Sequence, residues 1–498
     1  MSAEAAITIP TMASYNYMAA LPEIILLSAA CFILILDLFI PQKNRVLTYL
    51  LAQATLVGLA VYTVMNITPV AEPIKDAFGG AFVRDNMGDI LKIFMYVTCV
   101  LVFVYSRDYL KDRKMFKGEY FVLGLFGVLG MMVMVSSASL LTLYIGLEIM
   151  SLTLYAMVAF KRDSGKASEA AMKYFVLGAI ASGMLLYGIS ILYGVTGHIG
   201  IAEISQYIGA QKDLNGTQGI GLTMVFALVF ILIGLAFKLG AVPFHMWMPD
   251  VYDGAPTCVT LYIGTITKIA AFAMVIRVLV DGLSGLMLEW QQILVVLAIL
   301  SLAVGNIVAI AQTNIKRMLA YSTISHIGFL LLGILAGNNA GYASSMFYIL
   351  TYALMSAAAF GLIIVMTREG HECDQIKDLS GLNERSPWFA FLILIVMFSL
   401  AGVPPTVGFF AKLQVLNSVI DVNLTWLAVV AVGFSIIGAY YYIRIVKVMY
   451  FDKPDAQAPA IKASFDTKVI VSANSLLVLG LGLFPGALIA LCNVAFKV

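Results

Sequence analysis

Four ionisable side chains lie deep inside long apolar stretches of the chain. Glu148 follows Leu-Tyr-Ile-Gly-Leu, and Lys238, Lys268 and Lys412 lie in three other stretches of similar character. A charge near the centre of a bilayer costs at least ~2.5–3.5 kcal/mol, so such residues usually pair with one another or line a polar path. A lysine whose carboxylate partner moves away can release a proton. These residues predict proton transfer, with structural ion pairs or snorkelling as the alternative.

Two other residues are secondary candidates for the same chemistry. His326 lies within a predicted helix, in Tyr-Ser-Thr-Ile-Ser-His-Ile-Gly. Its imidazole could relay protons near neutral pH, although a hydrogen-bonded core histidine is an equally good interpretation. Lys173 is predicted near one end of its helix, where it could face Glu148. We therefore count both as possible members of the proton path.

Lys92 and Glu23 are expected to play a different part. Lys92 lies a few residues into its predicted helix, one turn after Asp89, which suggests a snorkelling pair. Glu23 lies near a helix end and is expected to reach the membrane interface. Neither residue is assigned to the proton path.

The composition shows which elements must position these side chains. The 498 residues are 61% hydrophobic and 12% charged, and the formal net charge is +2. Soluble domains are usually ~45–50% apolar and ~25% charged, so a soluble enzyme and a disordered chain are excluded. The small net charge excludes a nucleic-acid binder. No strand pattern is apparent, and no alternation typical of a β-barrel, so helices must cross the membrane.

We therefore expect an all-α polytopic membrane protein with about fourteen transmembrane helices. A spanning helix needs roughly 20 mostly apolar residues. The expected helices are residues 17–40, 46–67, 87–106, 119–136, 138–160, 168–194, 220–241, 256–280, 290–312, 318–336, 342–367, 387–416, 424–450 and 467–494. The loops between them are mostly short, so residues 1–498 are interpreted as one membrane domain.

The basic residues predict the orientation of these helices. Twenty of the 30 Lys and Arg residues fall in one set of alternate loops, five fall in the opposite set and five lie within helices. Positive residues stay on the inner side. With an even number of helices, both termini lie on the same side of the membrane and are predicted outside. The five cysteines are scattered without paired spacing, which indicates neither a disulfide framework nor an iron–sulfur or other metal site.

Two of the expected helices contain prolines in a similar setting. One break is Lys-Leu-Gly-Ala-Val-Pro-Phe-His at residues 238–245, and the other is Ala-Gly-Val-Pro-Pro-Thr-Val-Gly at residues 401–408. Proline frees backbone carbonyls inside a helix, which is tolerated at membrane depth only where protein or water satisfies them. Two broken helices in corresponding positions indicate an ion site between inverted repeats. Two unrelated proline kinks are the alternative.

The breaks suggest a division of the chain into two inverted five-helix repeats. Gly234-x-x-x-Lys238 in the first repeat is matched with Gly408-x-x-x-Lys412 in the second. The expected parts are an N-terminal three-helix segment at 1–118, the first repeat (helices 4–8) at 119–281, the second repeat (helices 9–13) at 290–451 and a C-terminal helix at 467–494.

Three segments resemble a known family. Residues 237–257 (Phe-Lys-Leu-Gly-Ala-Val-Pro-Phe-His-Met-Trp-Met-Pro-Asp-Val-Tyr-Asp-Gly-Ala-Pro-Thr), 314–328 and 402–412 are similar to motifs of the antiporter-like membrane subunits of respiratory complex I (NADH:quinone oxidoreductase). Within this family the chain resembles the bacterial N-type subunits. The longer L-type subunits carry an added lateral helix, and M-type subunits usually have Glu where Lys412 stands.

The resemblance implies roles for four of the candidates and places a fifth in a family motif. Glu148 and Lys238 match the family's charged pair, Lys268 its central lysine, and Lys412 the lysine of the second half. His326 falls in a helix motif of the family. The chain would then be a non-redox, proton-translocating subunit of a translocase in the bacterial inner membrane.

The resemblance also implies cofactors and partners. The cofactors NADH, FMN and iron–sulfur clusters, and also quinone, would bind to other subunits and none to this chain. The expected neighbours are the antiporter-like subunit M and the small subunit K. A stand-alone cation/proton antiporter and a structural spacer of the membrane arm are the other two functions that the sequence leaves open.

Overall fold

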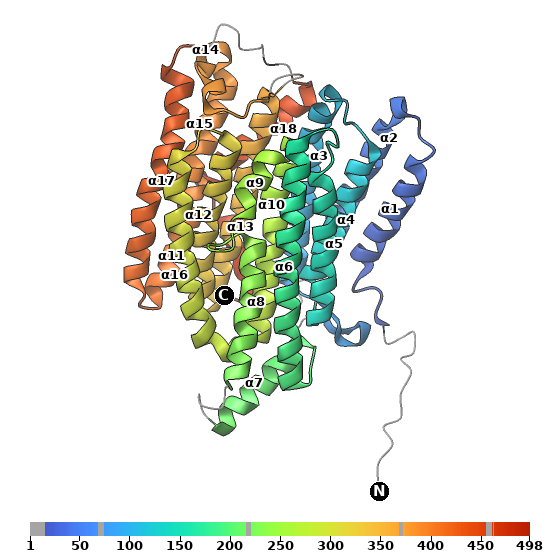
Figure 1. Cartoon of the computed structure of the whole chain (residues 1–498), viewed down its shortest axis with the longest axis vertical. Helices are drawn as coiled ribbons and strands as arrows, with labels where there is room; N and C mark the ends of the chain where they lie inside the picture. The colour runs from blue at the N-terminus through green and yellow to red at the C-terminus, as the bar shows by residue number, and fades with distance from the viewer. Residues whose placement is uncertain (1–14, 68–73, 216–220, 368–371, 455–460, 462) are drawn as a thin grey trace.

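The structure is a computed structural model that describes residues 15–67, 74–215, 221–367, 372–454, 461 and 463–498. Figure 1 shows a bundle of long helices whose axes are roughly aligned with one another. Within the described residues, twelve helices are long and apolar enough to cross a membrane. The other two expected spans are the 17-residue helix α1 and a helix broken into α15 and α16. The predicted all-α polytopic fold is confirmed.

The described residues form helices along most of the chain, with one short hairpin. In chain order, the elements are α1 (Leu21–Asp37), η2 (Gln42–Asn44), α2 (Val46–Met65), β1 (Ile74–Ala77), η3 (Phe78–Gly80), β2 (Phe82–Arg84), α3 (Asn86–Asp112), α4 (Gly118–Val135), α5 (Leu140–Val158), α6 (Gly165–Thr196), α7 (Ile201–Asn215), α8 (Leu222–Leu239), α9 (Trp247–Gly254), α10 (Thr257–Val275), the π-helical segment η5 (Ile276–Gly282), η6 (Ser284–Leu286), α11 (Met287–Ala311), α12 (Ile315–Leu335), α13 (Asn339–Met366), η7 (Ile376–Leu379), α14 (Leu382–Arg385), α15 (Pro387–Ala401), α16 (Val407–Asp421), α17 (Thr425–Phe451), α18 (Phe465–Leu483) and α19 (Gly486–Phe496).

Two regions that the sequence analysis treated as loops contain regular structure. Helix α7 lies in the loop expected after residue 194, and an antiparallel hairpin of β1 and β2 lies in the loop expected after residue 67. The expectation of no strand was therefore wrong for this hairpin. Strands of three and four residues are too short for alternation to be visible in the sequence.

The charge asymmetry of the loops corresponds to two different ends of the bundle. At one end, which we call the basic end, Arg113 pairs with Glu372 at 2.8 Å and Lys166 pairs with Asp253 at 2.9 Å. At the other, the hairpin end, Phe82 of β2 bridges to Ser137. Helix α14 lies toward one end of the view and α7 toward the other (Figure 1). Arg368 and Lys462, two of the basic residues counted above, lie outside the described residues.

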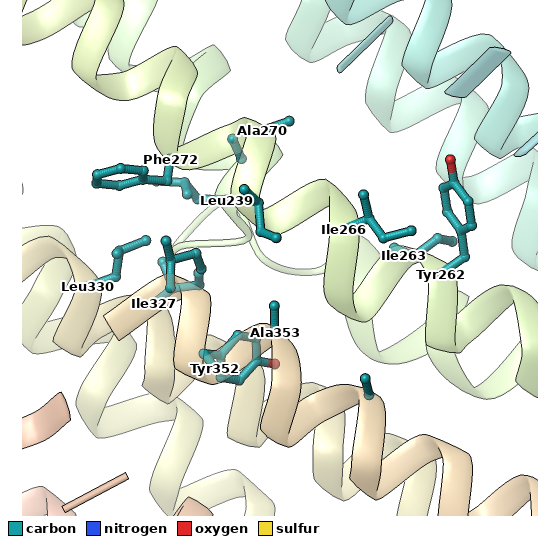
Figure 2. Close-up of a cluster of buried hydrophobic side chains, with 14 of the residues drawn as sticks. Leu239, Tyr262, Ile263, Ile266, Ala270, Phe272, Ile327, Leu330, Tyr352 and Ala353 are labelled. Atoms are coloured by element: carbon teal, nitrogen blue, oxygen red, sulfur yellow. The ribbon is translucent and has the colours of Figure 1, made fainter. Parts of the chain in front are cut away.

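Helices α10, α12 and α13 form the centre of the bundle. Nearly every residue of these three helices is buried, whereas only a third of the apolar window of α2, α17 or α18 is buried. Figure 2 shows Ile266 and Ala270 of α10, Ile327 of α12 and Ala353 of α13 among the side chains packed at this centre. Because all these helices are apolar, packing and not hydropathy separates the centre from the surface that would face lipid.

The two breaks have the same backbone geometry. Helix α8 is capped by Gly240, which has a φ of 85° and whose N–H donates to the Ala236 carbonyl at 2.8 Å. Helix α15 is capped by Gly402, which has a φ of 88° and whose N–H donates to the Phe398 carbonyl at 3.0 Å. The left-handed conformation favours glycine and ends a helix. Each break therefore leaves the carbonyl of the preceding residue, Leu239 or Ala401, at the end of a half-helix.

Candidate functional site

Lys238 lies in the last turn of α8 and reaches α5. Its side chain is buried, and its Nζ donates to Ser151 Oγ at 2.8 Å. Glu148 precedes Ser151 by three residues, which places both side chains on one face of α5. Lys238 therefore contacts α5 within one turn of Glu148. Among the described residues no ion pair within 4.0 Å joins them, so a hydroxyl lies where the sequence suggested direct pairing.

One carboxylate oxygen of Glu148 is left without a partner. The residue is half-buried, and its Oε1 atom is buried without a hydrogen-bond partner among the described residues. A buried, unpaired carboxylate oxygen costs free energy and is often matched by water or a mobile proton. The predicted pair is therefore brought to neighbouring positions but is not locked together.

Lys268 is fully buried in the middle of α10. Its Nζ donates to the carbonyl of Leu239, the last residue of α8, at 2.9 Å. The ammonium group also lies 5.2 Å from the ring centre of Trp247, which is the first residue of α9. The negative end of the helix dipole and the aromatic face both favour a cation at this place. Lys268 thus lies against both sides of the first break.

Lys412 makes the equivalent contact at the second break. It lies in α16, and its Nζ donates to the carbonyl of Ala401, the last residue of α15, at 2.7 Å and to Ser435 Oγ at 2.9 Å. Like Lys268, it lies near an aromatic face, 5.0 Å from the centre of the Phe329 ring. Lys268 and Lys412 thus make the same kind of contact with the end of a half-helix. The sequence match of Lys238 with Lys412 stays a prediction; Lys238 precedes its break, whereas Lys412 follows its own.

His326 lies in a cluster of hydroxyl groups in the second half. Its Nδ1 is 2.6 Å from the Tyr348 hydroxyl and its Nε2 is 3.2 Å from the Tyr442 hydroxyl. The Tyr442 hydroxyl is in turn 2.5 Å from Ser322 Oγ. The Phe329 ring lies 5.0 Å from Lys412 Nζ and stacks on the Tyr348 ring, so Lys412 and His326 lie in one region. Imidazole and hydroxyl groups can each donate and accept, so this cluster suits proton relay.

Lys173 lies apart from the buried lysines. Its side chain is 44% exposed and pairs with Glu169 at 2.8 Å and with Asp250 at 2.9 Å. Asp250 also pairs with Arg317 of α12 at 2.8 Å. Because Asp250 lies on α9, these contacts attach the second half of the first broken helix to α6 and to α12. These contacts suit a positioning role for Lys173, and its membership of the proton path stays a prediction.

Lys92 does not have the partner that the sequence suggested. Lys92 is 1% exposed and pairs with Glu23 of α1, which is 7% exposed. Asp89, its expected partner, pairs with Arg84 at 3.1 Å. The expected Lys92–Asp89 pair and the snorkelling lysine are therefore wrong, because Glu23 of α1 pairs with Lys92 in a buried position. The expectation that Glu23 lies near the membrane interface stays a prediction.

The Asp250 contacts lead to a prediction for stability. Burial opposes ionisation of this carboxyl, but hydrogen bonds and charges from Lys173 and Arg317 outweigh it and lower the pKa of Asp250 below its usual value. Since the folded pKa is depressed, the stabilisation is complete above the ordinary carboxyl pKa of about 3.9 and is lost as pH falls through the lowered pKa. We expect Asp250→Asn to lower the Tm of the purified protein by a few degrees at neutral pH.

The control for this prediction is Glu169→Gln, which removes only the exposed contact to Lys173. Exposed ion pairs contribute little because solvent screens them. We expect no change in Tm for this variant. Equal losses in the two variants would contradict a specific role for Asp250.

Comparison with known proteins identifies the family. The family model described as "NADH:quinone oxidoreductase/Mrp antiporter, TM" matches residues 137–438. NADH-quinone oxidoreductase subunit N of Thioalkalivibrio sulfidiphilus is 58% identical over 482 residues, which are 97% of this chain and 98% of the relative. Subunit N of Thiobacillus denitrificans is 55% identical and covers 95% of this chain and 96% of its own length. The chain belongs to this family.

Solved structures agree with this membership. A chain of respiratory complex I from Thermus thermophilus has a TM-score of 0.80 and 29% identity, and the match covers 94% of this chain and 98% of that one. A chain of the Mrp complex from Dietzia has a TM-score of 0.78 and 20% identity, with 97% of each chain covered, which shows a shared fold. The chain is thus a multi-pass membrane subunit whose partners are other membrane subunits of such a complex.

Some residues of the site could not be found from the sequence. Ser151, Trp247, Tyr348 and Ser435 contact the predicted residues, yet none of them is charged, and only Trp247 lies in a segment that the sequence analysis singled out. Aromatic and hydroxyl residues are common in apolar helices, so their types carry no signal. Among the described residues, no group of three or more His, Cys, Asp and Glu side chains is arranged to hold a metal ion.

Proposed function

We propose that this chain moves protons through a buried row of Glu148, Lys238, Lys268, His326 and Lys412. In this proposal it is the non-redox, antiporter-like subunit of a proton-translocating NADH:quinone oxidoreductase. NADH, FMN, iron–sulfur clusters and quinone bind to other subunits, and quinone reduction there drives proton movement here.

The observation that carries the proposal is the matching contact of Lys268 and Lys412. Each ammonium group donates to the carbonyl that ends a half-helix, and neither is within 4.0 Å of a carboxylate among the described residues. A cation inside the bundle that is held by neutral dipoles and aromatic faces, without a carboxylate, costs free energy and can give up its proton without leaving an unpaired anion. The two breaks therefore present two equivalent proton-binding positions.

The energies involved are of the same order. At ~4 Å and an effective dielectric of about 20, two unit charges interact by ~4 kcal/mol. Moving one charge through the membrane field costs ~2.3 kcal/mol per 100 mV. A change of distance between Glu148 and Lys238 could therefore drive a proton against the membrane potential. Half-buried Glu148, with one oxygen unpaired, is the group free to make that change.

The proposal includes an orientation and neighbours. We place the basic end on the inner side of a bacterial inner membrane and both termini on the periplasmic side, following the distribution of lysine and arginine. We infer that subunit M and the small subunit K are the adjacent chains. The two five-helix halves at 119–281 and 290–451 are inferred to be inverted repeats, which the equal geometry of the breaks supports.

The experiment that tests the function compares Glu148→Gln with Glu119→Gln in the assembled complex, reconstituted in vesicles. Glutamine keeps the size of Glu148 but cannot carry the charge that acts on Lys238. We expect proton uptake coupled to NADH oxidation to fall several-fold. Glu119 is an acidic residue on α4 that is 54% exposed and pairs with Arg45, so its variant should behave as the wild type.

Other outcomes would favour the alternative functions. Unchanged proton uptake in Glu148→Gln would favour a structural spacer of the membrane arm. Exchange that requires Na⁺ and persists in the isolated chain would favour a stand-alone cation/proton antiporter. Either result would contradict the proposed function.

A further inference from the structure

A second pair of opposite charges is buried at the hairpin end, on helices that the lysine row does not use. Lys92 Nζ of α3 is 2.5 Å from Glu23 Oε1 of α1, and Ser136 Oγ donates to the same oxygen at 3.3 Å. The second oxygen of Glu23, Oε2, is buried and has no hydrogen-bond partner among the described residues. The pair is therefore shielded but incompletely satisfied.

A cavity lies close to this pair. Its volume is about 360 Å³, and the residues that line it include Val83, Ser137, Glu203, Asp85, Arg277 and Asp281. Its lining is therefore partly charged, which suits water.

Only a thin layer of chain separates the pair from the cavity. The Phe82 ring centre is 5.4 Å from Lys92 Nζ, whereas the next residue, Val83, lines the cavity. Successive side chains of a strand point to opposite faces. In the same way Ser136 binds Glu23, whereas Ser137 lines the cavity. The Val83 N–H donates to the Ser136 carbonyl at 2.8 Å, so these two segments together form the layer.

The pair is connected to the helix of Lys268. Arg277 lies in η5, the π-helical continuation of α10, and donates to both carboxylate oxygens of Asp85 at 2.7 and 2.8 Å. Asp85 caps α3, the helix that carries Lys92, by accepting from the Gly88 N–H at 2.8 Å. Single turns of π-helix are frequent at functional sites. A shift of α10 would therefore reach α3 through Arg277.

We propose that Glu23 and Lys92 form a second proton-exchange site, which passes protons between the protein interior and the cavity at the hairpin end. The proposal rests on the proton translocation proposed above. Transfer of one proton from Lys92 Nζ to Glu23 neutralises both groups. Glu23 then releases that proton to water in the cavity, and the neutral amine of Lys92 takes up another from the interior, which restores the pair. A purely structural role explains less, because buried ion pairs add little net stability.

The test uses the double variant Glu23→Gln with Lys92→Met in the assembled complex in vesicles. Both charges are removed together, so no unpaired buried charge remains. We expect the number of protons moved per NADH oxidised to fall several-fold. The control is Arg84→Gln with Asp89→Asn, which neutralises the neighbouring ion pair and should leave that number unchanged.

A parallel measurement on Lys268→Met separates this inference from the proposed function. If Lys268→Met abolishes proton movement and the double variant retains it, the second site is overturned and the lysine row stands. If Lys268→Met retains proton movement, the proposed function fails, and the second site fails with it.

The inference can also be tested without a substitution, in case the double variant does not assemble. A hydrophobic carbodiimide modifies only carboxyl groups that are protonated and shielded, so Glu23 of the wild-type complex should be labelled during turnover. Labelling of Glu148 without labelling of Glu23 would overturn the inference.

Discussion

Lys268→Met is expected to reduce proton translocation by about 10²-fold or more, which is the usual contribution of a positioned proton-transfer group. Lys268 is fully buried and donates to the Leu239 carbonyl at the first break. Methionine fills nearly the same space and removes a costly buried charge, so the fold should survive. The measurement is proton uptake into vesicles that contain the assembled complex, set against the rate of NADH oxidation.

The matched control for this prediction is Lys316→Met. Lys316 is also buried and also donates to a backbone carbonyl, that of Ala255 at 3.1 Å, but it lies at the basic end near the start of α12. Either substitution leaves one buried carbonyl without its donor, which costs about 1–3 kcal/mol. We expect Lys316→Met to retain proton uptake. Equal effects of the two substitutions would show that lost hydrogen bonding, and not a lost proton carrier, causes the defect.

Gly408→Ala is expected to destabilise the second break by about 3 kcal/mol or more, at the upper end of the usual cost of overpacking. Gly408 is the second residue of α16, and its N–H donates to Ser399 Oγ at 3.1 Å. A Cβ at this position would lie 1.8 Å from the Ser399 carbonyl oxygen. That atom belongs to the backbone of α15 and cannot rotate away. The measurements are the Tm of the purified complex and the amount of this chain that assembles into it.

Gly433→Ala is the control for this substitution. Gly433 lies in α17, and a Cβ there would have no atom within 4 Å. Alanine is up to ~1 kcal/mol more favourable than glycine inside a helix, so this variant should be as stable as the wild type or slightly more so. Normal assembly of Gly408→Ala would show that the close crossing of α15 and α16 is not required.

The sequence pointed to the deep lysines but not to the groups that they contact in the structure. Lys268 and Lys412 could be found because a lysine in a long apolar stretch is conspicuous and costly. The carbonyl groups that they contact could not be found from the sequence, since Leu239 and Ala401 are ordinary apolar residues there. The same limit applies to the spacing that matched Lys238 with Lys412, because spacing along one helix says nothing about the next helix in space.

The Glu23–Lys92 pair shows this limit most clearly. Sequence distance favours Asp89 as the partner of Lys92, yet the folded chain brings Glu23 to it from another helix and leaves Asp89 to Arg84. Helix periodicity predicts neighbours one turn apart. Contacts between helices depend on how their faces pack, which no local pattern contains.

The amino-acid sequence by itself determined the class of protein, most of the spanning helices, the two proline breaks and some of the deep ionisable residues. Each of these follows from local hydropathy and from proline and glycine chemistry, which act over one or two turns. The tertiary structure alone decided that Lys268 and Lys412 make the same contact, that Lys173 is exposed and pairs with Asp250, and that α13 lies at the centre. Apolar helices are alike in composition, so only close packing of particular faces selects which of them meet.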